Sequence, residues 1–246
     1  MASAVGIIPA RYASTRFPGK PLKLLRGLPV IAHVCAAAAK VGNLKEFHVA
    51  TDDERIAQAV RDSGYSAIMT RSDHKCGTDR IVEALGKLGE KFDIVVNIQG
   101  DEPLIDPAAV EKAVDALAGG SADWSTLCHP ITAEEARDPN KVKVVMDVNG
   151  RALYFSRAPI PYPRDGFPAE YFGHIGLYCY RREALLRFAS LPQTPLESSE
   201  KLEQLRALEN GMSIVCVKVA GAAPGIDTPE DLARTEEILA KREAEK

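Results

Sequence analysis

Short apolar runs alternate with longer segments of helical periodicity through the first half of the chain. The predicted strands cover residues 4–9, 47–51, 66–70 and 94–98, and the predicted helices cover residues 30–41, 54–62, 78–88 and a segment that begins at Pro107. The first strand is an unbroken apolar run, which suits a central strand covered on both faces. The alternation predicts βαβ units and a largely parallel sheet.

The second half of the chain is less regular. Its strand-like runs cover residues 142–146, 152–156, 175–180 and 214–219, and its helical segments cover 196–209 and 229–241. Four prolines between residues 159 and 168 interrupt the pattern, which indicates an inserted region with antiparallel pairing. The last helix has a clear start, with Thr228 as its expected N-cap and Pro229 at its first position.

Composition and charge narrow the class of protein. The chain has 246 residues, of which 46% are hydrophobic and 26% are charged, and this is typical of a globular protein near the upper size for one core. We therefore expect a single domain over residues 1–246, with an inserted subdomain at about 125–195. A formal net charge of −3 lacks the basic excess that nucleic-acid binding requires, so no nucleic-acid partner is expected.

Neither a membrane segment nor a cysteine motif is evident. No apolar stretch approaches the roughly 18 residues of a membrane helix, so no membrane association is expected. The five cysteines are widely scattered and form no CxxC pair, which indicates a reducing compartment and predicts a cytoplasmic protein. His33 and Cys35 lie in an apolar helical segment and are expected in the core, and Trp124 is expected to serve packing.

The loop after the first strand is the first candidate for chemistry. Between Pro9 and Pro21 it carries three cations, Arg11, Arg16 and Lys20, among small residues, so it could wrap an anionic ligand. It is not a Walker A loop, because the earlier glycine is missing and Pro21 replaces Ser or Thr. On spacing alone, a phosphate-binding loop and a solvated basic loop are equally supported.

Acidic residues form the second candidate. Asp101 and Glu102 follow the buried strand at 94–98, and Asp227 precedes the last helix. Two aspartates from distant positions can hold Mg²⁺ through hard oxygen ligands, with nucleotide phosphates completing the coordination. Asp227 has an alternative role in serving the helix start, and spacing does not show that the two aspartates meet.

Residues 8–22 resemble the opening motif of the CMP-Kdo synthetases, the 3-deoxy-manno-octulosonate cytidylyltransferase family. Further segments resemble signatures of this family in the same order: residues 50–52, 69–74, 76–80, 97–103, 138–140, 142–143, 154–157, 174–178, 202–206 and 225–231. Sialic-acid cytidylyltransferases share a similar opening loop, and the later segments favour the CMP-Kdo synthetases. Cys76 departs from the small polar residue that the family often has there.

The resemblance implies a fold, a reaction and an assembly. The fold is an α/β nucleotidyltransferase with a doubly wound, mostly parallel sheet and an inserted antiparallel sheet region, which serves dimerisation and closes over the sugar. The reactants are CTP and 3-deoxy-D-manno-octulosonate (Kdo), Mg²⁺ is the cofactor, and the products are CMP-Kdo and pyrophosphate. The protein is expected to be a cytoplasmic homodimer that supplies lipopolysaccharide synthesis.

The resemblance also implies roles for individual residues. The implied nucleotide-binding residues are Pro9, Ala10, Arg11, Lys20, Arg71, Ser72, Thr78 and Gln99. Arg11, Lys20 and Asp101 are the implied catalytic residues, and Asp101 with Asp227 would hold Mg²⁺. The implied sugar-binding residues are Arg157, His174, Tyr178, Glu203 and Gln204.

Alternatives remain open at this stage. Each sugar-side residue has an ordinary structural role available, such as a half-buried strand position, a surface ion pair or the solvated face of a helix. The acceptor could be 8-amino-Kdo or a sialic acid. A regulatory module that binds a nucleotide without turnover is the rival from another functional class, and Lys20, Asp101 and Asp227 together argue against it.

Overall fold

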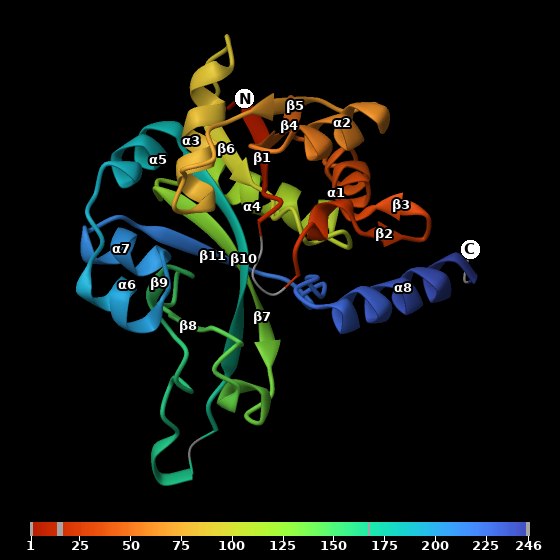
Figure 1. The fold of residues 1–246 in the computed structure, drawn as a ribbon. Coiled ribbons are helices and arrows are strands. Elements are labelled where there is room, and N and C mark those ends of the chain that lie inside the picture. The colour runs from red at the N-terminus through yellow and green to blue at the C-terminus, as the bar shows by residue number, and fades with distance from the viewer. Residues whose placement is uncertain (1, 14–16, 167, 245–246) are drawn as a thin grey trace. The chain divides into compact units, whose positions relative to one another are not determined.

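The structure is a computed structural model that describes residues 2–13, 17–166 and 168–244, the last three of these by their backbone only. The chain forms two compact units (Figure 1). The N-terminal unit consists of Ser3–Phe92, Val96–Glu111 and Ala223–Lys246. The central unit consists of Lys112–Ala222 with the short segments Met1–Ala2 and Asp93–Val95.

A parallel sheet forms the centre of the N-terminal unit. Strand β1 (Ala4–Ala10) pairs in parallel with β4 (Glu46–Thr51), and β4 pairs in parallel with β5 (Ala67–Met69). On the other side of β1, the N–H of Ile98, just after β6 (Ile94–Asn97), donates to the carbonyl of Ile7 at 3.0 Å. Nearly every residue of β1 is buried, because this short apolar run is covered on both faces. The predicted central strand is confirmed.

The helices of this unit follow its strands. They are the single 3₁₀ turn η1 (Lys20–Leu22), α1 (Val30–Ala38), α2 (Glu54–Asp62), α3 (Gly77–Lys87), α4 (Pro107–Gly119), which continues into the central unit, and α8 (Pro229–Ala244). The predicted βαβ alternation is thus confirmed, with α1 ending three residues earlier than expected.

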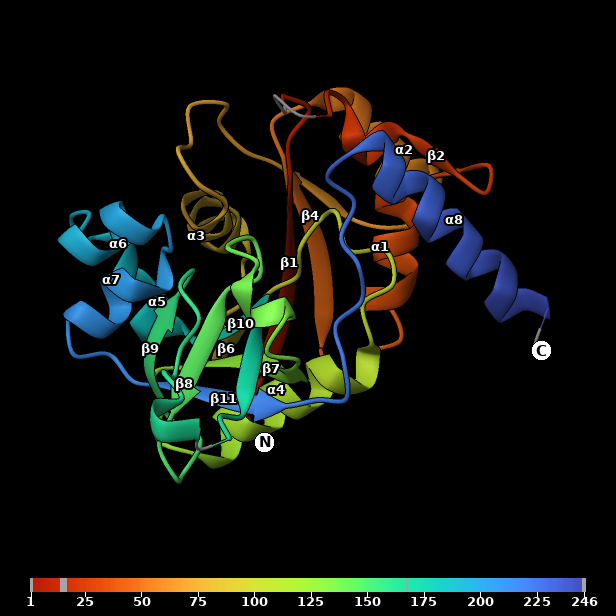
Figure 2. The same ribbon diagram turned by 90° about the horizontal axis from the view of Figure 1, so that it is seen from below.

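The C-terminal segment packs against the start of the chain. Helix α8 lies beside a short hairpin of β2 (Leu24–Leu25) and β3 (Leu28–Pro29), as both ribbon views show (Figures 1 and 2). Buried Ile226 joins Phe17, Leu25 and Val30 in one apolar cluster. This cluster fixes the segments on either side of Lys20 and Asp227 with respect to each other.

The central unit is built mainly of antiparallel strands. Strand β7 (Trp124–Ile131) pairs antiparallel with β10 (Tyr171–Arg181), and β8 (Lys143–Met146) pairs antiparallel with β10 and with β9 (Ala152–Ser156). Strand β11 (Ile214–Lys218) runs parallel to β7. The predicted combination of a mostly parallel α/β sheet and an inserted antiparallel region is confirmed. Trp124 packs edge-on against Tyr180 and Phe188, which confirms its packing role.

The helices of the central unit correct one prediction. They are α5 (Arg182–Ala189), α6 (Pro195–Glu200) and α7 (Gln204–Glu209), with single 3₁₀ turns at η2 (Glu135–Arg137) and η3 (Arg164–Gly166). The continuous helix predicted for residues 196–209 is wrong, because Lys201 adopts a left-handed conformation with φ of 54°. The end of α6 is held instead by β9, where the Ser156 hydroxyl donates to the Glu200 carboxylate at 2.6 Å.

Sequence patterning missed β7 and α5. Strand β7 has buried Ser125 and Thr126 near its start and Pro130 near its end, so its sequence shows no continuous apolar run. Both hydroxyls are satisfied: Ser125 donates to the Ala113 carbonyl at 2.6 Å, and Thr126 donates to the Leu177 carbonyl at 2.7 Å. In the part of the chain that the structure describes, no helix is long and apolar enough to span a membrane.

Candidate functional site

A pocket of about 340 Å³ opens in the N-terminal unit where β1 and β6 end. The carboxyl ends of parallel strands are the usual ligand position in open α/β sheets. The residues that line this pocket are Pro9, Ala10, Arg11, Lys20, Pro21, His74, Lys75, Cys76, Gly77, Arg80, Gln99, Gly100, Asp101 and Asp227. Six of the lining residues are Lys, Arg or Asp, so the pocket suits a charged ligand.

A glycine permits the close approach of two backbone segments at the floor of this pocket. A Cβ atom on Gly100 would lie 2.7 Å from the carbonyl oxygen of Pro9, closer than a side chain can come without moving the backbone. Because Gly100 directly precedes Asp101, this contact also sets the position of the Asp101 backbone. The segment after β6 can therefore lie against the end of β1.

The opening loop positions Lys20 through a left-handed turn. Gly19 has φ of 68°, and its N–H donates to the Tyr12 carbonyl at 3.0 Å. Turn η1 then starts at Lys20, whose Nζ lies 2.6 Å from Asp101 Oδ2 and 3.1 Å from Asp227 Oδ1. Its side chain is only 12% exposed. One ammonium group thus links two carboxylates that are 126 positions apart in the sequence.

Asp101 and Asp227 come together through the backbone as well. The N–H of Ile226 donates to the Asp101 carbonyl at 2.9 Å. Capping of α8 falls to other groups: the Asp231 N–H donates to the Thr228 hydroxyl, and the Thr228 N–H donates to the Asp231 carboxylate at 3.0 Å. The predicted N-cap at Thr228 is confirmed, and the Asp227 carboxylate is directed toward Lys20 instead.

The carboxylates of Asp101 and Asp227 meet the requirements of a hard cation. Both lie within hydrogen-bonding distance of the same positive charge, so a single cation can contact both. Carboxylate oxygens are the ligands that Mg²⁺ prefers, and Mg²⁺ sites of nucleotide-dependent enzymes use one or two carboxylates plus substrate phosphates. Among the described residues no group of three or more potential metal ligands gathers.

Glu102 has a different electrostatic environment from its neighbour Asp101. Burial, together with the negative charge of Asp101, raises the pKa of Glu102 to about 8, and the nearby charge of Lys20 opposes the shift. The Glu102 carboxyl is therefore largely neutral at pH 7.

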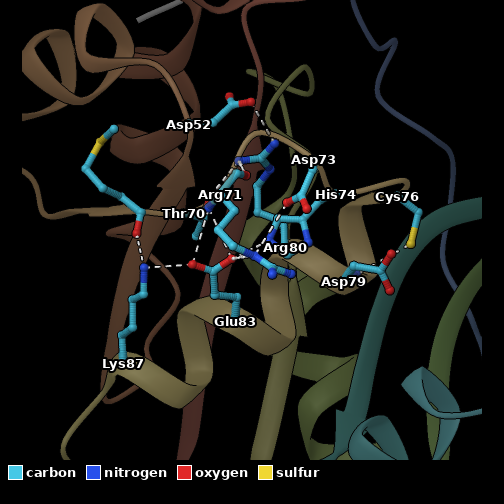
Figure 3. A network of polar contacts seen from close by, with 11 residues as sticks. Asp52, Thr70, Arg71, Asp73, His74, Cys76, Asp79, Arg80, Glu83 and Lys87 are labelled. Carbon is cyan, nitrogen blue, oxygen red and sulfur yellow. Dashed lines mark hydrogen bonds and ion pairs between the residues drawn. The ribbon is translucent and has the colours of Figure 1, made fainter.

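A network of polar contacts holds the segment between β5 and α3 at one wall of the pocket (Figure 3). The guanidinium of Arg80, a buried side chain of α3, donates to the Thr70 hydroxyl at 2.5 Å and pairs with Asp52 at 3.2 Å. At the other end of α3, Lys87 donates to the Met69 carbonyl at 2.6 Å. The side chains of α3 therefore fix the backbone that precedes it.

The first turn of α3 faces the same pocket. Cys76 is the N-cap of α3, and its Sγ accepts from the Asp79 N–H at 3.5 Å. Cys76 and Gly77 both line the pocket. An N-terminal helix turn exposes backbone N–H groups and favours negative charge, so this wall suits an anionic group of a ligand.

Only some of the predicted nucleotide-binding residues line the pocket. Pro9, Ala10, Arg11, Lys20 and Gln99 line the pocket. Arg71, Ser72 and Thr78 are not among its lining residues: Arg71 and Ser72 are exposed, and Thr78 is buried in the first turn of α3. Arg16 lies outside the described residues.

Sequence reasoning missed four side chains that line this pocket: His74, Lys75, Cys76 and Arg80. All four lie in segments that carry the family resemblance, at residues 69–74 and 76–80, or directly between them. The family motifs therefore already pointed to this part of the sequence. The sequence alone does not show that these residues line the same pocket as Lys20.

The predicted sugar-binding residues lie in the central unit. Arg157 donates from Nε to the Glu200 carbonyl at 2.8 Å and from Nη1 to the Pro139 carbonyl at 2.9 Å. Burial lowers the pKa of His174 to about 3, so its ring is neutral and carries no charge for an anion.

Of the other three residues in this set, Tyr178 lies beside His174, and Glu203 and Gln204 lie at the start of α7. His174 and Tyr178 have tilted rings with centroids 5.4 Å apart. Glu203 is the N-cap of α7 and Gln204 is its first residue; Gln204 is buried and Glu203 is partly buried. Arg157 is therefore the one cation within the predicted set.

Comparisons with known proteins identify the family of the chain. A family model described as cytidylyltransferase matches residues 5–214. A 3-deoxy-manno-octulosonate cytidylyltransferase of Escherichia coli is 47% identical over 100% of this chain and 99% of its own length. Another from Syntrophotalea carbinolica is 50% identical over 96% of this chain and 98% of its own length.

Solved structures extend the comparison. A structure of CMP:2-keto-3-deoxy-manno-octonic acid synthetase complexed with CTP is similar at a TM-score of 0.95 and 46% identity, covering 98% of this chain and 100% of that chain. A cytidylyltransferase from Leptospira borgpetersenii, 15% identical with a TM-score of 0.65 over 98% of this chain and 88% of that chain, shares the fold.

Proposed function

Because the chain belongs to the family of 3-deoxy-manno-octulosonate cytidylyltransferases, we propose that it transfers CMP from CTP to the C2 hydroxyl of Kdo, giving CMP-Kdo and pyrophosphate. The observation that carries this proposal is the 46% identity, over nearly the whole of both chains, to a synthetase solved with CTP. A pocket with cationic side chains and a helix N-terminus along its wall agrees with a triphosphate substrate.

In the proposed mechanism, the C2 hydroxyl oxygen of Kdo bonds to the α-phosphorus of CTP in line. The bond from that phosphorus to the departing pyrophosphate breaks, and the hydroxyl proton is released to solvent. No covalent bond to the enzyme is needed, so the chain contributes positioning and charge stabilisation. Arg11 and Lys20 bind the triphosphate and offset the negative charge that develops on the leaving pyrophosphate. Near-attack alignment of this kind can contribute roughly 7 to 11 kcal/mol.

Mg²⁺ is the proposed cofactor, with Asp101 and Asp227 as its protein ligands. Their shared contact with the Lys20 ammonium supports this assignment. When bound, the ion supplies positive charge to the phosphate oxygens. Without the ion, the single positive charge of Lys20 lies between the two carboxylates and offsets part of their mutual repulsion.

For the acceptor, we assign Arg157 to the Kdo carboxylate. It is the cation of the sugar-side set, whereas neutral His174 can contribute only a hydrogen bond. Tyr178, Glu203 and Gln204 complete the proposed set. The inserted region at about 125–195 is assigned to sugar binding and dimerisation.

The proposal includes a homodimer in the cytoplasm that supplies lipopolysaccharide synthesis. The family resemblance is the support for the dimer and for the pathway. For the compartment, further support comes from the five cysteines, all within the described part of the chain, which form no disulfide.

Pyrophosphate release tests the function directly. CTP and Mg²⁺ would be supplied with Kdo, 8-amino-Kdo or N-acetylneuraminate in parallel, with EDTA as a control. We expect release with Kdo. Release with another sugar alone would reassign the acceptor, and CTP binding without release from any acceptor would favour a nucleotide-binding module.

Asp101→Asn tests the assigned metal ligand within the same assay. It should reduce turnover by at least a hundredfold while leaving the melting temperature nearly unchanged, because the side chain keeps its size and loses its charge. Asp62→Asn, an exposed position on α2, is the matched control. Near-normal turnover of Asp101→Asn would remove Asp101 from the mechanism.

A further inference from the structure

His74 lines the pocket and has no role in the mechanism above. Its side chain is only 6% exposed, and its Nε2 contacts the carboxylate of Glu83 (Figure 3). No partner for Nδ1 occurs among the described residues. A buried ring in a ligand pocket therefore has one nitrogen occupied by the protein and one available to a ligand.

Glu83 holds this ring in a fixed position. Its carboxylate also accepts from the Arg71 N–H at 3.1 Å and pairs with Lys87 at 2.7 Å. Hydrogen bonds from these groups, Lys87 above all, lower the pKa of Glu83 to about 2 despite some burial. Glu83 is therefore an anion across the neutral pH range and acts only as a hydrogen-bond acceptor.

The acceptor character of Glu83 decides the tautomer of His74. In the ring form with one proton, Nε2 carries that proton and donates it to the carboxylate, so Nδ1 presents a lone pair. Such a nitrogen accepts a hydrogen bond from an amino group and disfavours a carbonyl oxygen. Cytosine and uracil differ in this respect, since cytosine has an exocyclic amino donor where uracil has a carbonyl acceptor.

We propose that Nδ1 of His74 accepts a hydrogen bond from the exocyclic amino group of cytosine and thereby selects CTP over UTP, with Glu83 as the positioning residue that fixes the ring. The inference rests on the proposed function, because it takes CTP as the substrate of this pocket. It adds a specificity-determining residue outside the set that the sequence indicated.

The anchoring of this segment supports a specificity role. Arg80 donates to the Thr70 hydroxyl and pairs with Asp52. Lys87 donates to the Met69 carbonyl, and Glu83 accepts from the Arg71 N–H. Three consecutive residues shortly before His74, at positions 69 to 71, are therefore anchored. A fixed acceptor discriminates better than a mobile one, because the wrong base cannot push it aside at low cost.

The test compares CTP with UTP in the wild-type enzyme and in His74→Ala. We expect the ratio of kcat/KM for CTP to kcat/KM for UTP to fall by about 10- to 100-fold in the variant. His74→Asn should restore part of the ratio, since its amide oxygen can take the place of Nδ1. His48→Ala is the matched control, because His48 also contacts a glutamate in the same unit but does not line the pocket.

Glu83 provides a second, independent variant. Glu83→Ala should reduce the CTP-to-UTP ratio while His74 is intact, and Glu83→Gln, which keeps an acceptor oxygen, should reduce it less. Equilibrium binding of CTP and of UTP, measured by calorimetry in each variant, gives a readout that does not depend on turnover. It should show the same loss of preference.

The outcomes separate this inference from the proposed function. An unchanged CTP-to-UTP ratio in His74→Ala, or an equal loss of affinity for both nucleotides, would overturn the inference and would place His74 against the phosphates or in a structural role. Absence of transfer to Kdo by the wild-type protein would refute the function, whereas the binding preference would still test His74.

Discussion

Replacing Gly100 by alanine tests how closely the pocket floor is packed. The new Cβ would lie 2.7 Å from the Pro9 carbonyl oxygen, about 0.7 Å short of the 3.4 Å at which ordinary contact begins. The neighbour is backbone of the buried strand β1, so it cannot rotate away. Overpacking of this kind destabilises by about 1–3 kcal/mol, which lowers the Tm of a chain of this size by roughly 2–12 °C.

Thermal unfolding followed by circular dichroism measures this effect, and Gly77→Ala is its control. A Cβ on Gly77 would lie 3.5 Å from Pro9 Cγ, an ordinary contact in the same pocket. Gly100→Ala should also weaken CTP binding in the presence of Mg²⁺, because it displaces the adjacent Asp101. A Tm within about 1 °C of the parent would show that the segment yields at little cost and would refute the packing argument.

Three further predictions concern other parts of the chain. Gly86→Ala, where a Cβ meets nothing within 4 Å, should stabilise the last turn of α3 by about 0.4–1 kcal/mol, and a lower Tm would contradict this. Arg157→Ala should raise the KM for Kdo more than that for CTP in steady-state kinetics; the reverse pattern would assign Arg157 to the nucleotide. The pKa of Glu83 is lowered from 4.5 to about 2, so its ionised form stabilises the fold above pH 4.5, and this contribution is lost as the pH falls toward 2. The free energy of unfolding of Glu83→Gln, measured by urea titration, should therefore fall less between pH 4.5 and pH 2 than that of the parent. An equal fall in both proteins would contradict this.

The centre of the parallel sheet could be predicted because β1 and most of β6 are apolar. Strand β1 and the strand at Ile94–Asn97 are buried on both faces, so an unbroken apolar run is their direct signature. Strand β7 was not predicted because it contains the polar residues Ser125 and Thr126. These two residues can be buried because their hydroxyls donate to carbonyls that are distant in the sequence. The break at Lys201 depends on contacts of Glu200 with β9, which local periodicity does not contain.

The candidate site was predictable as a set of residues but not as an arrangement. The sequence pointed to Lys20 and to Asp101 with Asp227 as a shared metal site, but spacing did not show that they meet. The Ile226 hydrogen bond and the packing of α8 against the opening segment bring them together. Arg80 and His74 were missed for a related reason. Their contacts with Asp52 and Glu83 become visible only when β4, β5 and α3 are assembled.

The position of Cys76 gives the chain a natural site for chemical labelling. Cys35, Cys128, Cys179 and Cys216 are buried, and burial raises the pKa of each thiol, so they react slowly with alkylating reagents. Cys76 is the partly exposed one, at the start of α3 and in the wall of the pocket. A fluorescent maleimide should therefore attach at one position, and the rate of its attachment reports whether the pocket is occupied, without any engineered cysteine.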